Sequence, residues 1–110
     1  MPSDIRVVIT GMGLVTPLGI GIQENWDALV GGKSGVGPVT GFNAERLPAQ
    51  ICGEVKDFNP EDYIERKEIK KMDRFIQFVM ASTKMAFDDA GLEKPDDEVA
   101  HRYGAVIGVG

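Results

Sequence analysis

The apolar positions between residues 65 and 90 repeat with the period of an α-helix. They alternate in steps of three and four residues, which places them along one helical face. The first half also carries four cations at helical spacing, Lys67, Lys70, Lys71 and Arg74. At about 100° per residue, these cations are centred about 150° away from the apolar face. Gln77 is the only polar residue between positions 75 and 81, so we expect the second half to be buried on nearly all sides. We therefore predict one helix over residues 65–90 that ends at Gly91. Its apolar face comprises Ile69, Met72, Ile76, Val79, Thr83, Ala86 and Ala90.

Three other stretches have the composition of β-strands. Residues 5–10 and 103–109 are almost continuously apolar and rich in β-branched side chains, which is typical of strands covered on both faces. Residues 51–58 alternate in part, and Gly53 marks a weak point or bulge in that strand.

Two shorter helices are predicted between these strands. Residues 22–30 form the first, which the glycine pair at 31 and 32 ends. Asn59 followed by Pro60 favours the start of the second, which we expect to reach about residue 64. The first helix has an apolar stripe that we expect to be buried, made of Ile22, Trp26, Leu29 and Val30.

This order of elements predicts an α/β fold, and 110 residues suffice for one domain. Strands covered on both faces leave apolar surface and backbone hydrogen-bonding groups that these few elements do not satisfy among themselves. We therefore expect residues 1–110 to be the opening part of a larger protein, and to be poorly soluble or partner-dependent in isolation.

Charge is distributed unevenly along the chain. The net charge of −5 argues against a general attraction to nucleic acid or to an anionic membrane. Residues 65–74 nevertheless hold five basic and three acidic residues, so this segment carries +2 and the rest −7. A basic island on an acidic protein indicates a local acidic partner. The alternative is a solvated helix face on which Glu65 and Glu68 form short-range ion pairs.

Two groups of residues invite a catalytic or nucleotide-binding interpretation, and neither is favoured. The glycine loop G-M-G-L-V-T at 11–16 is superficially similar to a dinucleotide fingerprint, but Thr16 replaces its third glycine and Pro17 interrupts the helix start. A tight turn is the favoured interpretation. Cys52 lies in an apolar strand pattern and His101 in an acidic loop, so a thiol–imidazole pair is not expected.

The remaining candidates concern metals, pockets and location. The acidic residues near position 96 lack the spacing of a calcium-binding loop, and we expect no metal and no cofactor. One cysteine excludes an internal disulfide. Without a signal-peptide pattern or a membrane-spanning apolar run, a cytoplasmic location is the expectation. Glycines in the last predicted strand indicate either tight packing or a substrate-facing wall.

Four segments, in order along essentially the whole chain, resemble the β-ketoacyl-[acyl carrier protein] synthases and in particular their elongating type II members. Residues 7–13, V-V-I-T-G-M-G, together with T-P-L-G at 16–19, resemble the start of these enzymes. Their W-x-x-L-x-x-G-x-S-G segment resembles W-D-A-L-V-G-G-K-S-G at 26–35. The start of their long helix resembles R-K-E-I-K-K-M-D-R-F at 66–75, and the strand that leads towards their active site resembles Y-G-A-V-I-G-V-G at 103–110.

The resemblance implies a thiolase-like αβαβα layered fold, a homodimer, and residues 1–110 as the N-terminal part of the synthase N-terminal domain. It implies a decarboxylative Claisen condensation, in which an acyl group on a cysteine is attacked by the carbanion that forms when malonyl carrier protein loses CO2. The family's Cys-His-His set is expected beyond residue 110, and Cys52 and His101 match none of its positions. The alternatives are a non-catalytic relative, such as the chain-length factor of polyketide synthases, and, more remotely, a nucleotide-binding domain.

The resemblance also implies where the acidic acyl carrier protein binds. Lys67, Lys70 and Lys71 match the family's basic docking patch, and Arg66 and Arg74 are its neighbours. The segment that follows residues 103–110 in the family forms the wall and gate of an acyl tunnel. We therefore expect substrate-pocket residues at Gly108 and Gly110.

Overall fold

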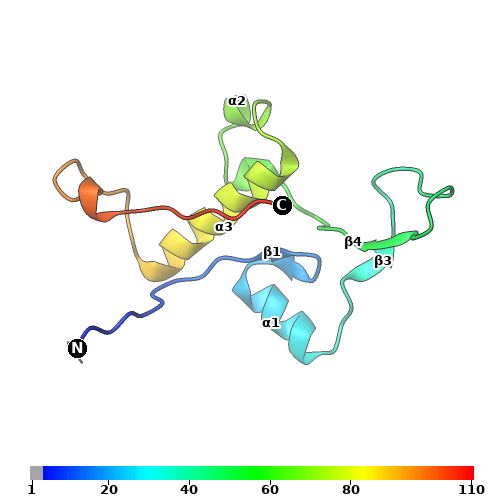
Figure 1. Cartoon of the computed structure of the whole chain (residues 1–110), viewed down its shortest axis with the longest axis horizontal. Coiled ribbons are helices and arrows are strands. Elements are labelled where there is room, and N and C mark those ends of the chain that lie inside the picture. The colour runs from blue at the N-terminus through cyan, green and yellow to red at the C-terminus, as the bar shows by residue number, and fades with distance from the viewer. Residues whose placement is uncertain (1–3) are drawn as a thin grey trace.

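The computed structural model describes residues 4–110 and is organised around one central helix, α3. Figure 1 shows α3 crossing the middle of the molecule, with α1 and β1 on one side, α2 on the other, and the β3–β4 hairpin projecting away. In chain order, the elements are β1 (Val15–Thr16), β2 (Gly19–Ile20), α1 (Ile22–Val30), β3 (Val36–Pro38), β4 (Ile51–Gly53), the 3-10 helix η1 (Pro60–Asp62), α2 (Arg66–Ile69), α3 (Arg74–Ala90) and the 3-10 helix η2 (Ala100–Arg102).

The long helix predicted over residues 65–90 is two helices, so that prediction is wrong in its first third. Asp73 adopts an extended conformation with ψ of 160° and separates α2 from α3. The side chain of Gln77 donates a hydrogen bond of 3.1 Å to the carbonyl of Met72, and the backbone N–H of Gln77 donates one of 3.1 Å to the carbonyl of Asp73. These two bonds hold the bend in place, because they satisfy carbonyls at the point where the helical ladder is interrupted.

The predicted end of α3 at Gly91 is confirmed. Gly91 has φ of 66°, in the left-handed region, and its N–H donates to the carbonyl of Asp88 at 3.1 Å. The next N–H, of Leu92, donates to Phe87 at 2.9 Å. This pair of bonds closes the helix, and glycine is favoured there because it has no Cβ.

All-round burial of the second half of the helix is not observed. Ala81 is fully buried, but Phe75 is 48% exposed and Met80 is 44% exposed. The polar residue in this stretch, Gln77, is itself buried, because its side-chain amide is used at the bend. The apolar surface of α3 is therefore only partly covered by this chain.

The glycine loop lies directly against α3. A Cβ placed on Gly13 would stand 1.9 Å from the carbonyl oxygen of Ser82, and one placed on Gly11 would stand 2.3 Å from that of Ala86. The backbone N–H between them, of Met12, donates to the carboxylate of Asp89 at 2.9 Å. These glycines are thus required for close packing of the N-terminal segment on the helix.

Helix α1 has the predicted bounds but presents a different face to the protein. Asn25 and Ala28 are its buried residues, whereas Trp26 is 60% exposed and Leu29 is 62% exposed. The stripe of apolar side chains that was expected to be buried is therefore mostly on the surface. Asn25 turns inward because its side chain bonds to the preceding turn, as described below.

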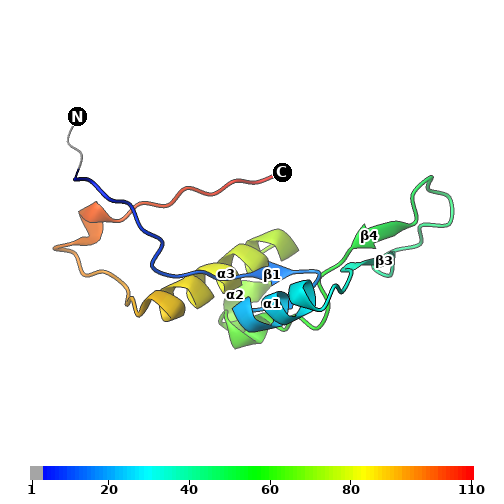
Figure 2. The same ribbon diagram turned by 90° about the horizontal axis from the view of Figure 1, so that it is seen from below.

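The strands that form are short and antiparallel. β1 pairs with β2, and β3 pairs with β4 so that Val36 lies opposite Gly53. Of the strand predicted over residues 51–58, only 51–53 belongs to a sheet. Residues 5–10 and 103–109 have no strand assignment and are exposed along their length. Figure 2 shows the second of these segments well separated from α3.

The chain as a whole is open. Its radius of gyration is 17.6 Å, whereas a compact domain of this length has about 13 Å. No large side chain among the described residues is fully buried. Within residues 4–110, no helix is long and apolar enough to cross a membrane.

Candidate functional site

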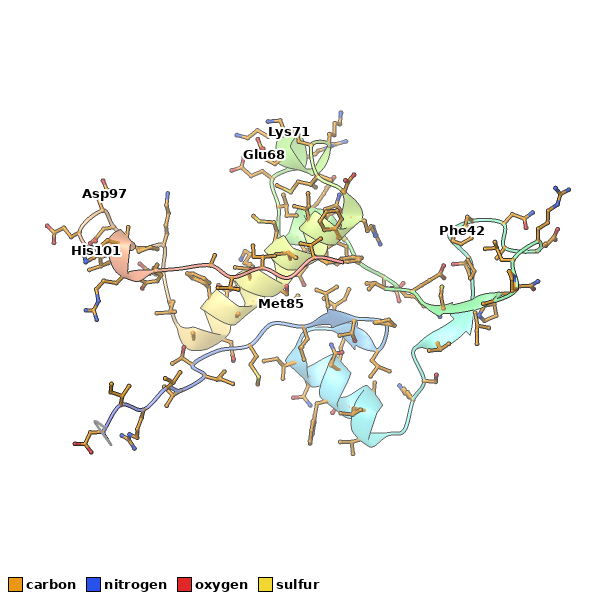
Figure 3. The ribbon with its side chains drawn as sticks, in the orientation of Figure 1. Phe42, Glu68, Lys71, Met85, Asp97 and His101 are labelled. Carbon is orange, nitrogen blue, oxygen red and sulfur yellow. The ribbon has the colours of Figure 1, made fainter. Side chains whose placement is uncertain are left out.

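Five cations gather on α2, on the turn that follows it and at the start of α3, and we refer to them as the basic surface. Helix α2 stands at an outer edge of the molecule in Figure 1, and Figure 3 shows Lys71 and Glu68 at its far end. All five are exposed, and Arg74 also lines an open hollow with residues that follow β3 and β4, such as Thr40 and Glu54. The basic surface comprises Arg66, Lys67, Lys70, Lys71 and Arg74.

Two lysines of the basic surface form ion pairs with glutamates of the same segment. Lys67 Nζ lies 2.9 Å from Glu65 Oε2, and Lys71 Nζ lies 3.1 Å from Glu68 Oε1. The second pair is bifurcated, because the same Nζ lies 3.3 Å from Glu68 Oε2. These are the short-range pairs that the alternative interpretation of the basic face predicts.

The two arginines are held by residues outside α2. Arg66 Nε lies 3.6 Å from Glu61 Oε1 of η1. The guanidinium of Arg74 lies over two aromatic rings, at 5.4 Å from the centroid of Phe58 and 5.2 Å from that of Phe78. A guanidinium in this position interacts favourably with the π faces and also covers them.

Lys70 differs from the other four cations. Among the described residues it has no acidic group within 4.0 Å and no aromatic ring beneath it. It is the C-cap residue of α2 and is exposed to solvent. Its ammonium group is therefore available for a partner without the loss of an internal contact.

An aromatic cluster anchors the basic surface to the rest of the chain. The rings of Phe58 and Phe78 meet edge to face with centroids 5.0 Å apart, and Phe58 stacks with Tyr63 at 6.0 Å. Phe58 and Ile64 are buried. Asn59 starts η1 by accepting a 3.2 Å bond from the N–H of Glu61, as predicted for this cap. Packing on both sides of η1 thus fixes where α2 begins.

The structure does not bring the other sequence candidates together. β4, which carries Cys52, lies at the opposite end of the molecule from His101, which Figure 3 labels beside Asp97. The glycine loop faces α3, so its backbone is not available to cradle a phosphate.

The acidic loop has a structural use. Asp96 caps the turn before η2 by accepting bonds of 3.1 Å from two backbone N–H groups. Residues 4–110 contain no group of three acidic, histidine or cysteine side chains placed to hold a metal.

Gly108 and Gly110 lie in the extended segment after η2, and both are exposed. A Cβ on either would meet no atom within 4 Å. Tight packing within residues 4–110 therefore does not account for these two glycines, and the pocket role remains a prediction.

Sequence reasoning missed a hydrogen-bonded unit at the T-P-L-G turn. The side-chain amide of Asn25 donates to the carbonyls of Gly19 and Gly21 at 3.0 and 2.7 Å, and its oxygen accepts from the hydroxyl of Thr16. Thr16 in turn accepts from the N–H of Leu18 at 3.1 Å. The signal in the sequence was Asn25, a polar residue beside the apolar stripe of the helix over residues 22–30.

Glu54 is a second residue that the sequence did not single out. Its carboxylate accepts hydrogen bonds from the Thr40 hydroxyl at 2.7 Å and from the backbone N–H groups of Thr40 and Gly41, each at 3.0 Å. These bonds, led by that of the Thr40 hydroxyl, hold the pKa of Glu54 below its ordinary value, and the charge of Lys56 acts in the same direction. Glu54 thereby ties the exit of β4 to the start of the loop over residues 39–50.

Comparison with known proteins identifies the family. Residues 4–110 match the family model described as the beta-ketoacyl synthase N-terminal domain. The chain belongs to the β-ketoacyl synthase family. A 3-oxoacyl-[acyl-carrier-protein] synthase 2 of Coxiella burnetii is 49% identical over 105 residues, covering 96% of this chain and 25% of that relative. The enzyme of the same name from a Synechocystis species is 42% identical over 106 residues, covering 94% of this chain and 26% of that relative.

A solved ketosynthase structure shows that the fold is shared as well. The ishigamide ketosynthase/chain length factor superposes with a TM-score of 0.72 and 37% identity, covering 78% of this chain and 21% of the other. The mixed helices and short strands described above are therefore part of a ketosynthase fold. The chain spans about a quarter of the length of the curated β-ketoacyl synthases that it matches.

Proposed function

We propose that these residues work within a 3-oxoacyl-[acyl carrier protein] synthase that elongates fatty acyl chains. The observation that carries this proposal is the 38–49% identity to relatives of that name over at least 94% of the chain. In that reaction an acyl group is transferred from its carrier thioester to a cysteine of the enzyme. Malonyl carrier protein loses CO2, and the carbanion displaces the cysteine thiolate to give a 3-ketoacyl carrier protein.

In this proposal, residues 1–110 form the N-terminal part of the synthase N-terminal domain within a thiolase-like αβαβα layered fold. The whole protein is a cytoplasmic homodimer, and its catalytic residues come from outside this chain. The open shape of the described residues and the exposed apolar side chains of α1 and α3 support this assignment, because such surfaces are stable only when covered.

The basic surface is the proposed docking site for acyl carrier protein. Five exposed cations on α2, the turn after it and the start of α3 give a local positive charge on a chain with net charge −5. Such a surface attracts an acidic protein from a distance and orients it, while exposed pairs keep the complex weak enough to dissociate after each delivery. Gly108 and Gly110 are the proposed contribution of this chain to the acyl pocket.

A chimera tests the assignment to the condensing enzymes. Residues 1–110 would replace the aligned quarter of the Coxiella burnetii relative, and condensation of acyl and malonyl carrier protein would be measured beside the parent enzyme. We expect the chimera to condense both substrates. A chimera that melts at the parent's temperature and yet forms no 3-ketoacyl product would contradict the proposal.

Charge reversal in the same chimera tests the docking surface. We expect Lys67→Glu combined with Lys71→Glu to raise KM for carrier-linked substrate about tenfold or more, since two attractions become repulsions. KM for a small thioester analogue, which lacks the acidic protein, should stay within about twofold of its original value. Equal changes for both substrates would remove the basic surface as the docking site.

The second candidate is a non-catalytic companion subunit, which the likeness to a ketosynthase/chain length factor structure keeps open. The two functions differ in one residue type, the nucleophilic cysteine. Incubating the protein that carries this chain with radiolabelled acyl carrier protein distinguishes them: a stable acyl-enzyme forms on a condensing enzyme and not on a companion subunit.

A further inference from the structure

We propose that Glu61, Glu65 and Glu68 are internal counter-ions that weaken carrier binding at the basic surface and so speed its release. This inference rests on the proposed function of that surface. Each of the three glutamates holds one cation, at 3.6 Å for Arg66, 2.9 Å for Lys67 and 3.1 Å for Lys71.

These ion pairs are of the exchangeable kind. The side chains of Lys67 and Glu65 are 74% and 72% exposed, and water screens such pairs strongly. An exposed pair of this kind contributes a factor of about 1.4 to 5 to an equilibrium constant. A carboxylate of the carrier protein can bind one of these cations only if the internal ion pair breaks. Each broken pair therefore lowers the binding constant of the carrier protein by that factor.

Glu68 is the strongest of the three competitors. Its side chain is 37% exposed, the least of the three, and both of its oxygens lie within 3.3 Å of Lys71 Nζ. Partial burial and two contacts make this pair harder to exchange than the pairs of Glu61 and Glu65. Removing the charge of Glu68 should consequently free Lys71 for the partner.

Lys70 has no counter-ion among the described residues, and this gives it a distinct role. It meets an incoming carboxylate without first losing an internal pair, so it makes the first contact and contributes the largest single share of docking. Arg74 contributes less, because its guanidinium is committed to the rings of Phe58 and Phe78.

The test uses Glu68→Gln in the full-length chimera, which keeps the shape of the side chain and removes its charge. We expect KM for carrier-linked substrate to fall about two- to fivefold at low salt. The effect should vanish at about 0.5 M salt, where charges are screened within a few ångströms, and KM for the small thioester should not change. Glu65→Gln serves as a second variant with a smaller effect in the same direction.

Glu45→Gln is the matched control, since it makes the same change of charge on a side chain that lies in the loop over residues 39–50 and pairs with no cation within residues 4–110. We expect it to leave KM unchanged. Among the lysines, Lys70→Ala should raise KM for carrier-linked substrate more than Lys67→Ala, by about twofold or more.

The inference is overturned if Glu68→Gln raises KM for carrier-linked substrate, or changes it no more than Glu45→Gln does. It is also overturned if Lys67→Ala raises that KM as much as Lys70→Ala does. Those results would stand apart from a failure of the proposed docking function. That function fails only if the double charge reversal affects carrier-linked and small substrates equally.

Discussion

Glycine is required at positions 11 and 13 because α3 occupies the space that a side chain would need. The carbonyl oxygens of Ser82 and Ala86 lie within 2.3 Å of the places that Cβ atoms at these two positions would take. Neither glycine has a positive φ. The requirement is therefore for close approach of two backbones, not for an unusual conformation.

Gly13→Ala should destabilise the fold by about 1–3 kcal/mol, because the added methyl group forces the N-terminal segment away from α3. The measurement is the shift of the urea unfolding midpoint of the full-length chimera that carries residues 1–110. Gly37→Ala is the control, since a Cβ at residue 37 meets no atom within 4 Å and Gly37 has no positive φ. Equal midpoints for the two variants would show that the close packing does not contribute to stability.

At the scale of elements, the β3–β4 hairpin is held by a side chain outside its ladder. Glu54 follows β4 and binds Thr40 and Gly41, which follow β3. Its lowered pKa means that the folded state favours the ionised carboxylate. The contribution of Glu54 to stability is thus present above the ordinary pKa of 4.5 and is lost as pH falls through the lower folded pKa.

Hydrogen exchange of the Thr40 and Gly41 amides should follow this titration. At pH 7, we expect Glu54→Gln to increase exchange at both amides relative to the original protein. After correction for the intrinsic effect of pH, the difference should shrink as pH falls below 4.5. A difference that persists unchanged at pH 3 would mean that the charge of Glu54 does not hold the loop.

At the scale of the whole molecule, apolar surface is the dominant feature. Val7 is 94% exposed, and a shallow hollow of about 250 Å³ beside α1 is lined by side chains that include Leu14, Trp26 and Leu29. Exposed apolar surface of this extent is unfavourable in water. The protein is therefore expected to bury it against further protein.

The 110-residue chain, when produced by itself, should bind the dye ANS and self-associate at micromolar concentration. Sedimentation velocity and dye fluorescence measure the two effects. Trp26→Ser combined with Leu29→Ser should reduce both, because these side chains lie on the exposed face of α1. Monomeric sedimentation with a single cooperative thermal transition would contradict this expectation.

The amino-acid sequence by itself determined the features that depend on neighbouring residues. The bounds of α1, the cap at Asn59 before Pro60, and the left-handed end of α3 at Gly91 all agree with the sequence-based predictions. Each rests on local backbone preferences, which do not need a distant partner. The family resemblance was accessible for the same reason, since its motifs are contiguous.

Only the tertiary structure decided which faces and charges are available. It placed Asn25 inward and Trp26 outward on α1 and broke the predicted helix at Asp73. Among residues 4–110, it gave each cation of the basic surface except Lys70 a partner. These outcomes depend on contacts between residues that the sequence does not bring together, such as Asn25 with Thr16 and Arg74 with Phe58. A periodic pattern reports which residues share a face, but the direction of that face is set by the free energy of packing the whole chain.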